Sequence, residues 1–217
     1  IIVFLNDHKA DTLTRVVNKV ADFKQKNPQE GITFLLAAGN AGVEAATNIV
    51  IEEAQTEMLL WVYSVVIIIC LITFRSIPVV VCIIVPLVIT SVLSQALMAF
   101  LGIGVKVATL PVIALGVGIG VDYGIYIFSK INEGLAMKKS LYMSYLYTLN
   151  QTGKAVGFTG VTLAICVATW VLSPIKFQAD MGLLLTFMFV FNMIGALTLI
   201  PSLAWLLGIG KKNNDAK

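Results

Sequence analysis

Charged residues are scarce in this sequence. They make up 12% of its 217 residues, whereas 58% are hydrophobic, and the mean hydropathy is +0.91. A typical soluble domain has about 25% charged residues, so the polar shell here is too small for a soluble core of this apolarity. The lipid bilayer is therefore the expected solvent for most of the chain. The net charge of +3 is small, and no nucleic acid partner is expected.

Residue types that carry chemistry are also few. Three cysteines, Cys70, Cys82 and Cys166, all lie in apolar runs and form neither a disulfide framework nor a C-x-x-C metal motif. The sole histidine, His8, lies in the polar stretch NDHKAD. No Walker loop, H-E-x-x-H or G-x-S-x-G motif is present. We therefore expect neither an enzyme nor a cofactor, and an energy source other than ATP.

The first 42 residues have the periodicity of a β-α-β unit. The apolar runs 1–5 and 32–37 have the length of strands. An amphipathic helix is expected between them, with Asp11 as N-cap and Asn27-Pro28 as its end. Its apolar stripe contains Leu13, Val16, Val17, Val20 and Phe23. Such a unit is too small to bury a core, and the sequence starts without Met or a signal peptide, so we expect a fragment of a longer protein.

Five apolar segments follow, each near the length of about 20 residues that crosses a bilayer. They are 58–74, 77–101, 105–129, 155–173 and 181–207. The first is the end of a long helix expected over 43–74, which leads the chain from water into the membrane. The expected layout is a soluble unit at 1–42, the long helix at 43–74, two spans at 77–129, a cytoplasmic helix at 134–153, two spans at 155–207 and a tail at 208–217.

Basic residues predict the orientation of the spans. If Arg75 faces the cytoplasm, alternation of the spans places seven lysines on the same side. These are Lys130, Lys138, Lys139, Lys154, Lys211, Lys212 and Lys217. Only Lys106 and Lys176 then lie opposite, which satisfies the positive-inside rule. Residues 1 to about 50 are thus expected outside the cytoplasm and the C-terminus inside.

The stretch SLYMSYLYTLNQTG at 140–153 is too short and too polar to span a bilayer. Helical spacing places Leu141, Tyr142, Tyr145 and Leu149 on one face. We expect a helix that lies in the plane of the cytoplasmic interface. A loop helix without membrane contact is the alternative.

Asp122 lies inside the third apolar segment, in the stretch GVGIGVDYGIY. A carboxylate at the centre of a membrane helix costs about 2.5 to 3.5 kcal/mol, so it should face protein or water and often marks an ion pathway. A carboxyl group that is removed from water holds its proton to higher pH, where it can exchange near neutrality. Asp122 is therefore the expected centre of a proton relay.

Glycines surround this aspartate. Gly116, Gly120 and Gly124 recur every four residues and form a smooth strip, while Gly118 lies one turn before Asp122 on the same face. We expect close approach of a neighbouring helix, which would shield the carboxylate from lipid.

Hydroxyl groups complete the expected relay. Tyr123 and Tyr126 lie next to the aspartate, and Thr159 and Thr162 lie in the fourth segment. Such groups hydrogen-bond a protonated carboxyl or order a chain of water. The alternative for the threonines is a hydrogen bond to a carbonyl of their own helix.

Two other functions are compatible with an intramembrane aspartate. Intramembrane aspartyl proteases need a second membrane aspartate and a G-x-G-D motif, whereas this sequence has G-x-G-x-D and its Asp180 lies at a span boundary. A non-transporting scaffold would hold Asp122 permanently ionised in an ion pair. The scaffold remains open and the protease is disfavoured.

Three stretches together resemble the C-terminal half of a resistance-nodulation-division transporter, of the MmpL-like and hopanoid-exporter-like branch. They are GVGIGVDYGIYIFSKINEG, TGKAVGFTGVTLAICVATWVLSPIKFQADMGLLLTF and ALTLIPSLAWLLG. The resemblance implies a polytopic α-helical membrane protein with two repeats of six spans. This chain would supply the last five spans of the second repeat, preceded by an extracytoplasmic β-α-β piece of a porter domain. Asp122 and Tyr123 match an Asp-Tyr pair that faces an equivalent pair in the first repeat.

The resemblance also implies the function. Members of this branch export lipids or other hydrophobic compounds across the bacterial inner membrane by antiport with protons. The implied partners are membrane lipid, the hydrophobic substrate and the N-terminal half of the same transporter, and a homo-oligomer is left open. Sterol-sensing proteins of the Patched type and SecDF-type proteins are the related alternatives.

Overall fold

The structure is a computed structural model that describes residues 10–27, 40–103 and 109–209. The chain divides into two compact units, Ile1–Thr56 and Glu57–Lys217. Every element in the described residues is helical. These elements are α1 (Ala10–Lys26), α2 (Asn40–Phe74), α3 (Ile77–Phe100), α4 (Leu110–Ala136), α5 (Leu141–Thr148), the π-helical turn η1 (Leu149–Gly153), α6 (Lys154–Ala168), the 3₁₀ turn η2 (Thr169–Leu172) and α7 (Lys176–Leu206).

In the first unit, α1 is the amphipathic helix that the spacing predicts. It begins one residue before the expected cap, Asp11, and its residue Leu13 is only 2% exposed, although Phe23 is 53% exposed. The two expected strands, 1–5 and 32–37, lie outside the described residues. The expected β-α-β piece is therefore not supported, since its helix is present but the described part of the chain contains no strand.

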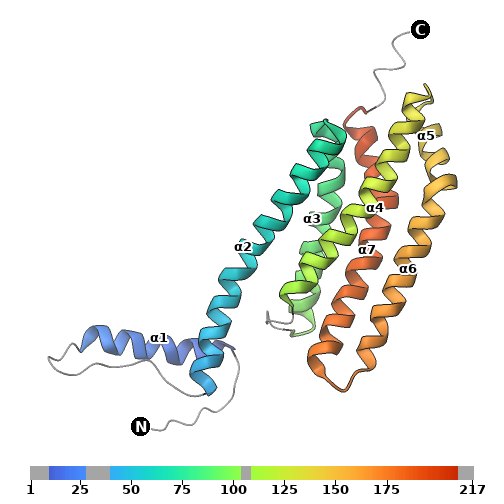
Figure 1. Cartoon of the computed structure of the whole chain (residues 1–217). Coiled ribbons are helices and arrows are strands. Elements are labelled where there is room, and N and C mark those ends of the chain that lie inside the picture. Colours follow the sequence, from blue (N-terminus) through green and yellow to red (C-terminus); the bar gives the residue numbers. More distant parts are fainter. Residues whose placement is uncertain (1–9, 28–39, 104–108, 210–217) are drawn as a thin grey trace. The chain divides into compact units, whose positions relative to one another are not determined.

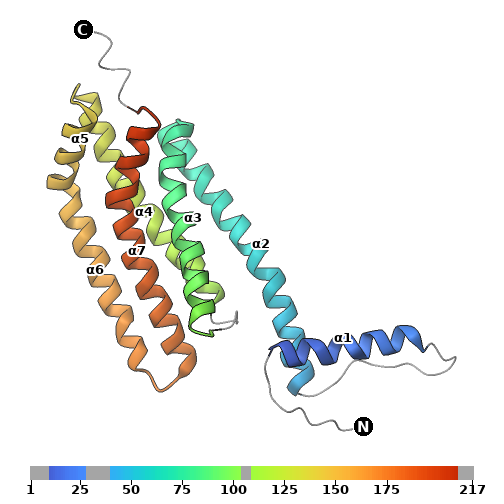
Figure 2. The ribbon, with the colours of Figure 1, turned by 180° about the vertical axis from the view of Figure 1, so that it is seen from behind.

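The second unit is a helical bundle. Five helices in the described part of the chain are long and apolar enough to cross a membrane, which confirms the expected number of spans. Helix α7 packs against α3, α4 and α6, and α3 also packs against α4. Figures 1 and 2 show these four helices side by side. Because α7 touches three spans, its side chains form the centre of the unit.

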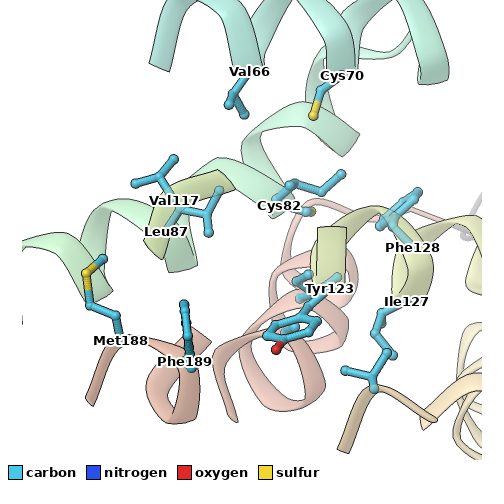
Figure 3. Packing of buried hydrophobic residues seen from close by; sticks show 14 of the residues in the cluster. Val66, Cys70, Cys82, Leu87, Val117, Tyr123, Ile127, Phe128, Met188 and Phe189 are labelled. Carbon is cyan, nitrogen blue, oxygen red and sulfur yellow. The ribbon is translucent and has the colours of Figure 1, made fainter. Parts of the chain in front are cut away.

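The core of this bundle is apolar and closely packed. Figure 3 shows part of it, with Leu87 of α3, Val117 of α4 and Met188 of α7 among the residues that are at most 3% exposed. Two contacts attach α2 to this core. The hydroxyls of Tyr63 and Ser91 lie 2.8 Å apart, and the rings of Phe74 and Phe128 meet edge to face at 5.6 Å between centroids.

One end of the bundle is basic. The α2–α3 connection, the α4–α5 connection and the end of α7 all lie at this end, and the α6–α7 connection lies at the other (Figures 1 and 2). Arg75 and Lys138 occupy the two connections with left-handed φ angles of 50° and 59°. We call this the basic end. Spans that alternate in direction require these connections to lie at the same end. Four lysines of the orientation prediction lie outside the described residues, namely Lys106, Lys211, Lys212 and Lys217.

Helix α5 is not separated from α6. It starts at the N-cap Ser140, whose Oγ accepts a 3.3 Å hydrogen bond from the amide of Met143. It then continues through η1 into α6, so that residues 141–172 form one helical run. The segment that is expected to lie in the membrane plane is thus the first part of this run, packed against α4.

A proline in α7 explains one contact of α5. Pro201 has no N–H, so the Leu197 carbonyl lacks the donor that a helix normally provides four residues later. The Tyr145 hydroxyl replaces that donor at 2.8 Å. A side chain of α5 thereby repairs the hydrogen bonding of α7.

Tyr145→Phe is expected to destabilise the protein, because it leaves the Leu197 carbonyl without this hydrogen bond. The expected loss is about 1 kcal/mol in the free energy of unfolding. It can be measured by titrating the full-length protein with sodium dodecyl sulfate in mixed micelles. Tyr142→Phe is the matched control, since that side chain is 67% exposed. Equal stability of the two variants would contradict the assigned contact.

Candidate functional site

Asp122 lies on a face of α4 that points away from the core of its own bundle. The exposed residues Leu115, Gly118, Asp122 and Tyr126 follow one another at spacings of three or four, and we call them the outer face of α4. A Cβ atom built on Gly118 would meet nothing within 4 Å. The described helices therefore leave Asp122 and Gly118 uncovered together.

The two acidic residues of α4 differ in their partners. Glu133, at the basic end, lies 2.6 Å from the amine of Lys130 and accepts a 3.1 Å hydrogen bond from the Tyr147 hydroxyl. The amine of Lys139 lies 4.1 Å above the Tyr147 ring and adds positive charge. Asp122 has no hydrogen bond or ion pair with any described residue. Only the acid in the middle of the span is unpaired.

The glycine strip lies on a different side of α4 and packs it against the bundle. A Cβ atom on Gly120 would lie 2.5 Å from Leu87 of α3 and 2.6 Å from the amide nitrogen of Asn192 on α7. Gly116 faces Met188 of α7, and Gly124 faces Ile83 of α3. These glycines therefore permit close approach inside the unit, and the helices they approach do not cover Asp122.

Asn192 is a buried polar residue that the sequence analysis missed. It is 2% exposed, and its side-chain amide donates a 2.7 Å hydrogen bond to the Gly116 carbonyl. This bond joins α7 to α4, close to Gly120. The sequence could have identified it, because Asn192 is the one amide side chain within 181–200 and polar residues in spans often hydrogen-bond to a neighbouring helix.

Three of the expected relay hydroxyls meet at one cavity of about 210 Å³ between α4 and the η1–α6 run. Its lining consists of Tyr123, Tyr126, Thr152, Ala155, Val156 and Thr159. We call it the α4–α6 pocket. Tyr123 is only 3% exposed, its ring lies among core residues (Figure 3), and its hydroxyl has no hydrogen-bond partner in the described part of the chain. Thr152 is a further hydroxyl of this pocket that the sequence analysis missed.

The two threonines of α6 differ. Thr162 donates a 2.8 Å hydrogen bond to the Phe158 carbonyl of its own helix, which is the alternative stated for it, whereas Thr159 lines the pocket. Tyr126 borders both regions, because it is 59% exposed on the outer face of α4 and also lines the pocket. The expected site residues are thus separated. Asp122 lies on the outer face of α4, whereas Tyr123, Tyr126 and Thr159 line the adjoining pocket, and of these three only Tyr123 is buried.

The described residues include no group of three or more His, Cys, Asp or Glu side chains that could hold a metal ion. The groups present at this site are a carboxyl and several hydroxyls. Such an arrangement can bind a proton at Asp122 and pass it along hydroxyls or water.

Comparisons with known proteins agree with these features. The MMPL family matches residues 3–216. Membrane protein MJ1562 of Methanocaldococcus jannaschii is 25% identical over 195 residues, which cover 88% of this chain and 49% of that protein. SCO6666 of Streptomyces coelicolor is 31% identical over 94 residues, and YdfJ of Bacillus subtilis is 26% identical over 98 residues. Each of these two alignments covers 43% of this chain and 13% of the relative.

All three relatives are named as membrane proteins, in line with the five apolar helices. The chain spans about half the length of the first relative and a smaller share of the other two. The family match extends over nearly the whole chain and agrees with the resemblance to the C-terminal part of MmpL-type transporters. This chain is a multi-pass membrane protein that belongs to the MMPL family.

Proposed function

We propose that this chain is the C-terminal part of a proton-driven exporter of lipids or other hydrophobic compounds, and that it acts as a transporter and not as an enzyme. The observation that carries the proposal is the position of Asp122. It is a carboxyl in the middle of a span, exposed on the outer face of α4 and without a partner among the described residues.

A bare carboxylate on that face would meet lipid and destabilise the helix in the membrane. Its cover must therefore come from residues outside the described part of the chain. The length of the MJ1562 relative leaves room for a second unit of similar size. We infer that the N-terminal repeat of the same transporter covers Asp122 and supplies a facing Asp-Tyr pair.

Proton binding would then act as a switch. A neutral Asp122 can lie against an apolar surface that an ionised Asp122 must avoid, so the two repeats prefer different contacts in the two states. One charge crossing the membrane supplies about 2.3 kcal/mol per 100 mV, which biases such a two-state element appreciably. Tyr126 borders both Asp122's face and the α4–α6 pocket, which gives the proton a route between them.

The basic end is the proposed cytoplasmic end, because Arg75, Lys130 and Lys138 gather there and Lys176 starts α7 at the opposite end. Residues 1 to about 50 are then proposed to lie outside the cytoplasm. The proposed location is the bacterial inner membrane, with residues 1 to about 50 on the periplasmic side and the C-terminus in the cytoplasm.

Labelling with a hydrophobic carbodiimide tests the proposal without knowledge of the cargo, since this reagent captures a protonated buried carboxyl. The full-length protein in lipid vesicles is treated across a pH series, and the peptide that contains Asp122 is quantified by mass spectrometry. We expect labelling to fall as pH rises, because the reagent reacts with the protonated carboxyl only.

Asp122→Asn is the blank for this experiment. Labelling at Asp122 that is absent at every pH, in a protein whose other membrane carboxyls are labelled, would mean a permanent ion pair. The proton-coupled function would then be rejected in favour of a scaffold.

A further inference from the structure

A second concave site lies at the basic end, away from Asp122. It is a groove of about 580 Å³ between α5 and the last turns of α7. Its lining consists of Leu141, Tyr142, Tyr145, Thr198, Pro201, Ser202, Trp205 and Leu206. We call it the α5–α7 groove. Its volume lies within the range of about 300 to 1,000 Å³ that is typical of small-ligand sites.

We call Tyr145, Thr198, Pro201 and Ser202 the floor of the groove, and each of its three hydroxyl groups donates its proton to a carbonyl of α7. The hydroxyl of Thr198 donates to the Ile194 carbonyl at 2.7 Å, and that of Ser202 donates to the Thr198 carbonyl at 2.7 Å. The Tyr145 hydroxyl donates to the Leu197 carbonyl at 2.8 Å. Because all three hydroxyls are already satisfied by α7, the floor suits an apolar occupant.

The rim of the groove has the residues of a membrane interface. Tyr142 is 67% exposed and Trp205 is 66% exposed, and rings with one polar atom prefer the boundary between acyl chains and headgroups. Leu206 is 72% exposed beside them. These side chains suit a groove that borders the lipid at headgroup level.

A lysine lies close in sequence to the first groove residue. Lys138 is exposed and precedes Leu141, the first groove residue, by three positions, which limits their Cα separation to about 11 Å. Its amine has no ion pair or hydrogen bond with any described residue, whereas the neighbouring Lys139 is held over the Tyr147 ring. The amine of Lys138 is thus available to an anionic group that binds at the Leu141 end of the groove, which we call its mouth.

We propose that the α5–α7 groove binds one anionic phospholipid, with an acyl chain on the apolar floor and the phosphate near Lys138. The charge of Lys138 selects the anionic headgroup, and the closed hydrogen bonds of the floor select a hydrocarbon chain. This site is separate from Asp122 and does not depend on the proposed transport. The bound lipid would tie α5 to α7 across the groove, in addition to the hydrogen bond from Tyr145 to Leu197.

Tryptophan fluorescence provides the test. The full-length protein is placed in phosphatidylcholine vesicles that contain increasing amounts of phosphatidylglycerol with brominated, quenching acyl chains. Subtracting the signal of the Trp205→Phe variant isolates the quenching at the groove. The comparison is with brominated phosphatidylcholine in phosphatidylglycerol vesicles. We expect half-maximal quenching at a mole fraction about fivefold lower for the brominated phosphatidylglycerol. One lysine near anionic lipid contributes about 1 kcal/mol, which corresponds to this factor.

Two variants locate the lipid. Lys138→Gln is expected to remove the fivefold preference, while Lys176→Gln, at the opposite end of the bundle, is expected to preserve it. Ser202→Phe fills the groove floor and is expected to abolish the saturable component. Leu199→Phe adds a ring to the same helix outside the groove lining and is expected to leave it unchanged.

Equal quenching by the two lipids in the wild-type protein would overturn the headgroup assignment. A saturable component that survives in Ser202→Phe would overturn the location. Absence of lipid quenching at Trp205 would overturn the proposal in favour of a protein segment in the groove.

Discussion

Replacing Asp122 with asparagine is expected to stop the proton uptake that we propose for the full-length protein. Asparagine has nearly the shape of aspartate but cannot bind and release a proton, so the proposed switch on the outer face of α4 stays in one state. At 100 mV one coupled proton supplies about 2.3 kcal/mol, enough for an about 40-fold accumulation of cargo. The measurement is potential-driven proton uptake by vesicles that contain a pH-sensitive dye and lipids of the source membrane.

Asp180→Asn is the matched control for this change. It removes the same charge from the start of α7, where Asp180 lies 3.9 Å from Lys176 at the end opposite the basic end. We expect Asp180→Asn to retain proton uptake and Asp122→Asn to fall to the level of protein-free vesicles. Uptake by Asp122→Asn at the wild-type rate would show that the proton does not use this carboxyl.

Gly120→Ala is expected to destabilise the packing of α4 against α3 and α7. The new Cβ atom would lie 2.5 Å from Leu87 and 2.6 Å from the Asn192 amide, so both neighbours must move. Moving Asn192 also disturbs its 2.7 Å bond to the Gly116 carbonyl. Overpacking of this kind costs about 1 to 3 kcal/mol. The free energy of unfolding in mixed micelles measures it.

Gly157→Ala is the control, because it makes the same change in helix propensity on α6, where a Cβ atom meets nothing within 4 Å. We expect this control to be at least as stable as the wild-type protein. A Gly120→Ala variant that matches the control would mean that α3, α4 and α7 are packed less closely than described.

The membrane helices were predictable because length and hydropathy alone decide whether a helix can cross a bilayer. Connections were harder. The sequence analysis separates a helix at 134–153 from a span that begins at 155. The backbone hydrogen bonds of a helix do not require apolar side chains, and η1 continues α5 into α6. The proline at 201 also has a consequence that needs coordinates, since its orphan carbonyl is satisfied by Tyr145, which is 52 residues from Leu197 along the chain.

At the candidate site, the position of Asp122 within a span and the side of the helix that each nearby residue occupies were predictable. Both depend only on residues that are close in sequence. The helical period correctly puts Gly118 on the side of Asp122 and the other three glycines elsewhere. It does not tell which side faces the bundle. The bond from Asn192 to Gly116 and the approach of Thr152 to Tyr123 join residues far apart in sequence, so neither was predictable from spacing.

The π-helical turn η1 fixes how the two concave sites of this unit are aligned. A π turn contains one residue more than the α-helical path that it replaces, and one residue corresponds to a rotation of about 100° around the helix axis. The side chains before η1 line the α5–α7 groove, and those within and after it line the α4–α6 pocket. A continuous α-helix over the same residues would turn Tyr145 away from the Leu197 carbonyl if Thr159 kept its place. The extra residue therefore rotates the side chains after η1 around the helix axis relative to those before it. One helical run can thus pack against α7 with its first part and against α4 with the next part.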